Sequence, residues 1–162
     1  TMQRRGFVQV FKVTDAGDVQ NINNSYGSTS DERIKTDITD SGSQWDDIKD
    51  IKVKKFKLGF GGDDSTKLGV IAQDLEAAGM NGLVKQRDAN EYEIKYNSVF
   101  GSLYEDGDDI PEGKKVGEIK ENKAKVKEVK YSILYMKAIK ALQEAMTRIE
   151  TLETKVKTLE DA

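Results

Sequence analysis

The sequence predicts an α+β protein with a short β-rich stump, a small mixed α/β globular part and a long C-terminal coiled-coil helix. Three observations support this. Residues 7–13 are mostly β-branched and aromatic, which is typical of a strand. Charged helical and strand-like segments alternate between residues 30 and 130. From residue 131 onward, apolar residues recur three and four positions apart, which is typical of a coiled coil.

The composition narrows the classes of function. With 34% charged and 36% hydrophobic residues, much of the chain must be solvated or paired between chains. A net charge of -3 does not favour nucleic acid, and no apolar run approaches the roughly 20 residues that cross a bilayer. The chain has no Cys and no His, which excludes a thiol nucleophile, a Ser-His-Asp triad and a Cys/His zinc site. We therefore expect no cofactor, no metal, no nucleic acid and no membrane.

The first part of the chain predicts a hairpin. A strand at 7–13, a turn at 15–18 and a short strand at 19–22 precede a loop at 23–27. A lone hairpin is marginally stable in water. We therefore expect it to pair with other chains, or to be the end of a longer β-rich fibre.

The middle of the chain predicts short alternating elements. They are a helix at 45–51, strands at 51–60 and 67–72 around a turn at 61–65, a helix at 73–78 stopped by Gly79, strands at 83–85 and 91–96, and a short helix from an Asn97 cap to about residue 104. The alternation of Tyr92, Ile94 and Tyr96 favours a strand. Residues 105–124 are rich in Asp, Glu, Gly and Lys, which predicts a loop or flexible insertion.

The C-terminal segment from residue 131 to 159 predicts a helix about 43 Å long. Its apolar positions form an a/d heptad seam, namely Tyr135, Ala138, Leu142, Ala145, Ile149, Leu152, Val156 and Leu159. Ile139 and Met146 widen this stripe. So long a helix with a narrow stripe needs partner chains, although the seam does not distinguish a dimer from a trimer.

Ser30 and Lys35 are the best candidates for covalent chemistry. A lysine with a reference pKa of about 10.4 must lose its proton before it can act as a base. Positions five apart on a regular helix point about 140° away from each other, so the two side chains cannot meet inside one helix. Either Ser30 lies in an extended arm, or the lysine comes from a neighbouring chain.

The same residues also have a purely structural interpretation. Thr29 followed by Glu32 has the spacing of a capping box at a helix N-terminus. From these residues alone, capping is a more common explanation than catalysis.

Three segments resemble one known family. Ser30–Lys35 resembles the opening motif of the self-cleaving intramolecular chaperones found at the C-termini of phage tail spikes and tail fibres. Leu68–Glu76 resembles that family's second segment. The stretches 129–132 and 138–143 resemble its final, tyrosine-led helix. The resemblance covers roughly residues 30 to 160.

The resemblance implies a homotrimer that cuts itself between Thr29 and Ser30. It implies that Ser30 is the nucleophile and Lys35 the general base of a serine endopeptidase acting once on its own chain. The residues expected to shape the site are Asp31, Glu32 and Arg33. Those expected to form the trimer seam are Leu142, Ala145, Ile149, Leu152, Val156 and Leu159.

The expected organisation follows from this. Residues 1–29 end a fibre, residues 30–130 form the chaperone with an insertion at about 97–128, and residues 131–162 form the coiled coil. The implied partners are two further copies of the chain and the upstream fibre as folding client. The implied location is the virion tail fibre, with assembly in the host cytoplasm and release of the chaperone part after cleavage.

Two alternatives belong to other classes of function. A purely structural trimerisation tip would share the helix but stay uncut. A receptor-binding tip would use residues 105–124 to contact the host, as exposed loops often carry binding.

Overall fold

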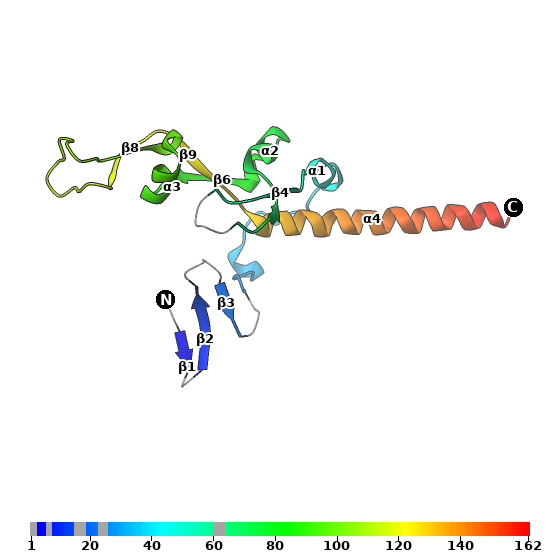
Figure 1. The fold of residues 1–162 in the computed structure, drawn as a ribbon. Coiled ribbons are helices and arrows are strands. Elements are labelled where there is room, and N and C mark those ends of the chain that lie inside the picture. Colours follow the sequence, from blue (N-terminus) through cyan, green and yellow to red (C-terminus); the bar gives the residue numbers. More distant parts are fainter. Residues whose placement is uncertain (1–2, 6–7, 15–18, 23–25, 60–63) are drawn as a thin grey trace. The chain divides into compact units, whose positions relative to one another are not determined.

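The computed structural model describes residues 3–5, 8–14, 19–22, 26–59 and 64–162. The chain divides into two compact units, residues 1–40 and 41–162, and each is described by itself (Figure 1). The described residues form a mixture of helices and short strands with a long C-terminal helix, as predicted.

The first unit begins with a three-stranded antiparallel sheet in the order β1-β2-β3. Its strands are β1 (Gln3–Arg5), β2 (Val8–Val13) and β3 (Val19–Asn21). The pairing of β2 with β3 confirms the predicted hairpin, whereas β1 was not predicted. The predicted turn at 15–18, and residues 23–25 of the predicted loop, lie outside the described residues.

The second unit contains the helix α1 (Trp45–Asp50) and an antiparallel pair, β4 (Lys54–Phe56) with β5 (Lys67–Gly69). Both strands are shorter than predicted, and residues 60–63, which hold most of the predicted turn, lie outside the described residues.

The helix α2 (Ala72–Ala77) ends as predicted at Gly79, whose φ of 80° is the left-handed conformation of a helix stop. The amide of Gly79 donates to Glu76, and that of Met80 donates to Leu75, which satisfies carbonyls at the helix end. A 3-10 turn, η2 (Asn81–Leu83), follows.

The predicted strand at 91–96 is wrong, because these residues form the helix α3 (Glu91–Tyr96). A capping box decides the matter: Asn90 accepts from the amide of Glu93, while the Glu93 carboxylate accepts from the amide of Asn90. The strand β6 (Val84–Asp88) pairs instead with β9 (Lys125–Val129), far away in sequence.

Asn97 is a cap as predicted, but the helix it starts is only the 3-10 turn η3 (Ser98–Phe100). The chain then enters β7 (Gly101–Leu103), which pairs with β8 (Ile119–Asn122). The predicted loop at 105–124 is therefore shorter, since its residues 119–122 form β8, which is stabilised by pairing with β7.

A small core lies where α2, η2, β6, β9 and the start of the last helix meet. Leu75 and Leu83 are each only 1% exposed, and the cluster also includes Val70 and Met80. Burying each such side chain contributes about 1.5–3 kcal/mol. Partly buried apolar side chains surround it, namely Ile51, Ala78, Val84, Val129 and Leu134.

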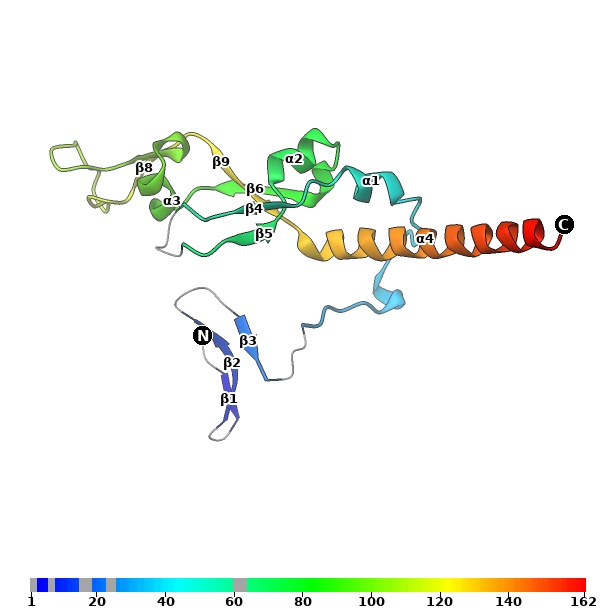
Figure 2. The ribbon, with the colours of Figure 1, turned by 45° about the vertical axis from the view of Figure 1, so that its right-hand side comes forward.

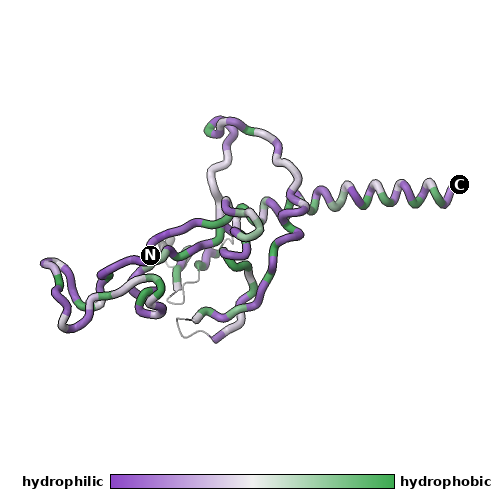
Figure 3. Tube along the Cα trace, turned by 90° about the horizontal axis from the view of Figure 1, so that it is seen from above, coloured by the Kyte–Doolittle hydropathy of each residue, from purple (hydrophilic) through white to green (hydrophobic). Residues whose placement is uncertain are grey.

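The last helix, α4 (Tyr131–Glu160), confirms the predicted helix, and α1 packs beside it (Figures 1 and 2). Hydrophobic positions recur along its length in Figure 3. Leu142 is 62% exposed and Leu152 is 60% exposed, so the chain does not cover its own apolar stripe. None of the described helices is long and apolar enough to cross a membrane.

Candidate functional site

Ser30 and Lys35 are in direct contact within one chain. The Lys35 ammonium donates a hydrogen bond to Ser30 Oγ, with 2.7 Å between Nζ and Oγ. Of the two arrangements left open by the sequence, the described chain therefore adopts the one in which both groups come from the same copy.

A single 3-10 turn brings the two side chains together. The turn η1 (Glu32–Ile34) lies between them, and Lys35 follows it in extended conformation, with φ -107° and ψ 147°. The Lys35 amide donates to the Glu32 carbonyl at 3.1 Å and closes the turn. A 3-10 turn has about three residues per turn and ends here at once, so the 140° separation of a regular helix does not apply.

The turn is capped by Asp31, so the prediction that Thr29 is the cap of a capping box is wrong. Asp31 Oδ1 accepts from the amide of Arg33 at 2.9 Å. Asp is a stronger cap than Thr, and the short turn begins two residues later than a Thr29 cap would require.

Arg33 holds the cap in place from the other side. Its guanidinium binds the Asp31 carboxylate through Nε and Nη2, at 2.9 and 2.5 Å. The side-chain hydrogen bond from Arg33 lowers the pKa of Asp31 below its ordinary value of 3.8, and the same bond raises the pKa of Arg33. Asp31 thus engages Arg33, while the described partner of Lys35 Nζ is Ser30.

The site is open to solvent in the single chain. Thr29, Ser30 and Lys35 are all exposed. Ile34 and Ile38, on either side of Lys35 in sequence, are each 66% exposed. The Ser30–Lys35 pair is therefore not shielded from water in the single chain.

The segments that resemble the second and third family motifs also meet. The Tyr131 hydroxyl, at the start of α4, lies 3.5 Å from the amide nitrogen of Val70. Gly69 lies directly beneath that hydroxyl and beside the Phe56 ring. The sequence showed each segment separately, but no local signal could show that they touch.

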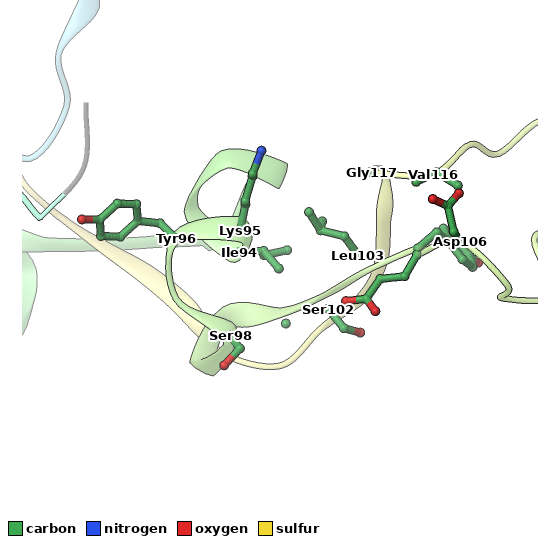
Figure 4. A pocket seen from close by; sticks show the side chains of 12 residues that line it. Ile94, Lys95, Tyr96, Ser98, Ser102, Leu103, Asp106, Val116 and Gly117 are labelled. Atoms are coloured by element: carbon green, nitrogen blue, oxygen red, sulfur yellow. The ribbon is translucent and has the colours of Figure 1, made fainter. Parts of the chain in front are cut away.

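A hollow of about 820 Å³ lies between α3, β7 and the loop that follows β7 (Figure 4). Ile94 and Leu103 line it together with Asp106, Val116 and Gly117 of the loop. It includes residues of the 105–124 segment, where a receptor contact was considered from the sequence, and that contact remains a prediction.

The arrangement defines a class of protein in which a hydroxyl–amine pair on an exposed segment precedes a mixed domain with a long, apolar-striped helix. Within that class, residues 30–85 match the family model Peptidase_S74, described as chaperone of endosialidase. The match includes the first two resembling segments, and the third lies beyond it. A search of curated proteins and a search of solved structures each found no match.

Proposed function

We propose that this chain is an intramolecular chaperone that trimerises, helps to fold a phage tail fibre or spike, and then releases itself by cutting between Thr29 and Ser30. The observation that carries the proposal is the 2.7 Å contact between Ser30 Oγ and Lys35 Nζ, located at the start of a match to a chaperone and peptidase family. The client is the fibre chain upstream of Ser30. The assembled fibre belongs to the virion tail, and assembly takes place in the host cytoplasm.

The chemistry is a serine acyl transfer followed by hydrolysis. Lys35, once neutral, takes the hydroxyl proton of Ser30, and Ser30 Oγ forms a bond to the Thr29 carbonyl carbon. The Thr29–Ser30 C–N bond then breaks, and the Ser30 nitrogen takes up a proton to become a free amine. Water hydrolyses the resulting ester, leaving a Thr29 carboxylate and a regenerated Ser30 hydroxyl.

The role assigned to the neighbouring residues follows from their contacts. Asp31 caps η1 and Arg33 fixes Asp31, so both hold the turn that brings Ser30 to Lys35. Glu32 contributes its carbonyl to the same turn. These three residues shape the site without taking part in bond making.

The trimer is proposed from the exposed stripe of α4. Leu142, Ile149 and Leu152 are each more than half exposed in the single chain. A symmetric bundle of three such helices would bury this stripe along the heptad seam.

The test is to express the full chain and to analyse it by denaturing electrophoresis and mass spectrometry. The wild type should give two fragments, 1–29 and 30–162. Ser30→Ala should stay full length, while Ser28→Ala, a matched change on the same exposed segment, should be cut like the wild type. Cutting of Ser30→Ala at the same bond would reject Ser30 as the nucleophile. An uncut but trimeric wild type would instead support the structural trimerisation tip.

A further inference from the structure

The helix α1 is capped by a residue of the distant helix α4. Glu144 Oε2 accepts from the Ser43 hydroxyl at 2.7 Å, and Glu144 Oε1 accepts from the amide of Gln44 at 2.9 Å. Gln44, the N-cap residue, makes no capping bond with its own side chain. One carboxylate on α4 therefore satisfies donors at the start of α1, where a negative charge is also favourable.

Two further contacts join the same elements. The Lys137 ammonium bonds to the Asp47 carboxylate at 2.5 Å. The Arg148 guanidinium lies 3.9 Å from the centre of the Trp45 ring, a cation–π distance. The side-chain hydrogen bond from Ser43 lowers the pKa of Glu144, which keeps its carboxylate charged. Together these contacts attach α1 to α4. Glu144 binds the N-terminal end of α1, which is the end nearer to Ser30 in sequence.

This attachment leaves the heptad seam free. With Leu142 and Ala145 at seam positions, Glu144 falls at position c, about 100° around the helix from Ala145. Lys137 shares position c, and Arg148 is at the flanking position g. A change at Glu144 can therefore loosen α1 without placing a new group in the seam.

The attachment also bears on the cleavage site through the chain itself. Residues 36–42 are all that separate Lys35 from Ser43. We infer that Glu144 is a positioning residue of the self-cleavage reaction, because it fixes the downstream end of the short segment that carries Ser30 and Lys35 to the helix that assembles the trimer. This inference rests on the proposed function.

The test uses the full chain, with Trp45 as an internal probe because it is the only tryptophan. Glu144→Gln should remain trimeric in sedimentation, should make Trp45 more accessible to acrylamide quenching, and should slow cleavage by roughly tenfold or more, as expected for a misplaced reacting pair. Ser43→Ala removes the other end of the same bond without touching α4 and should act in the same direction. Glu150→Gln is the matched control on an outer position of α4 and should behave as wild type.

Three results would overturn the inference. In the first, Trp45 becomes accessible but cleavage keeps its wild-type rate, so that attachment does not matter. In the second, Trp45 stays protected in both Glu144→Gln and Ser43→Ala, so that Glu144 does not hold α1. In the third, the variants slow cleavage no more than Glu150→Gln does. A wild type that is never cut would reject the proposed function, and the role of Glu144 with it. That outcome is distinct from the three above because it concerns the wild type and not the variants.

Discussion

Gly69 and Tyr131 lie so close together that a side chain on Gly69 would collide with the tyrosine. A Cβ atom on Gly69 would be 2.7 Å from the Tyr131 hydroxyl and 3.3 Å from the Phe56 ring. These residues join β5 to the first turn of α4, next to the buried cluster that contains Val70. The glycine thus allows the long helix to start directly on the mixed domain.

Gly69→Ala should destabilise the protein by about 1–3 kcal/mol, since the tyrosine must shift to admit the methyl group. Thermal or urea unfolding would measure this. The cost should shrink when Tyr131→Phe is present, because the phenylalanine lacks the colliding hydroxyl. Gly82→Ala is the matched control, as a Cβ there meets nothing within 4 Å. Equal costs of Gly69→Ala with and without the Tyr131 hydroxyl would show that this contact is not the cause.

Lys35→Arg should abolish cleavage as fully as Lys35→Ala. An arginine keeps a positive charge and can still donate to Ser30 Oγ, but it does not lose its proton in proteins and cannot act as a base. Both variants should remain trimeric, because Lys35 is exposed and far from the heptad seam in sequence. Time-resolved electrophoresis is the measurement. Efficient cutting of either variant between Thr29 and Ser30 would remove Lys35 from the mechanism.

Leu142→Asp should break the trimer and slow cleavage together. The substitution puts an unpaired charge into the seam, which is costly to bury. In the separate chains the exposed Ser30–Lys35 pair lacks cover, and we expect a fall in rate on the order of 100-fold. Sedimentation and electrophoresis are run on the same sample. Gln143→Asp introduces the same charge one residue away, at an exposed position, and should leave both properties intact. A monomeric Leu142→Asp that cuts at the wild-type rate would disprove the idea that cleavage depends on trimerisation.

Acid should weaken the attachment of α3. The side-chain hydrogen bond from Arg87 lowers the pKa of Glu93 below its ordinary value of 4.5, and the side chain is only 12% exposed. A carboxylate whose pKa is lower in the folded state stabilises the fold at every pH above its unfolded-state pKa. That stabilisation is lost as the pH falls through the lowered, folded-state pKa. The melting temperature should therefore decrease as the pH is lowered below about 4.5.

Glu93→Gln tests that assignment. The substitution should lower the free energy of unfolding at pH 7 by about 1 kcal/mol, a modest figure because Arg87 is partly exposed. It should also reduce the decrease in melting temperature below pH 4.5. Glu91→Gln changes an exposed carboxylate in the same helical turn and should leave the pH profile as it is. If both variants kept the full acid dependence, other carboxylates would be responsible.

Local signals in the sequence determined several features. The heptad spacing determined α4, and Gly79 determined the end of α2, because both depend on residues a few positions apart. The β-branched and aromatic run at 7–13 predicted β2 for the same reason. The opening motif also singled out Ser30 and Lys35 before any geometry was known.

The helix α3 was missed although its signal is local. Tyr92, Ile94 and Tyr96 alternate as in a strand, but Asn90 and Glu93 have the spacing of a capping box, and their capping bonds favour a helix with Ile94 buried on one face.

Other features were decided only by tertiary structure. The partner strand of β6 is β9, which follows only after α3, η3, β7 and β8, and this non-local pairing leaves no local trace in the sequence. The attachment of α1 by Glu144 likewise joins residues a hundred positions apart. Such contacts depend on which surfaces meet after the chain has folded, and a local pattern carries no information about that.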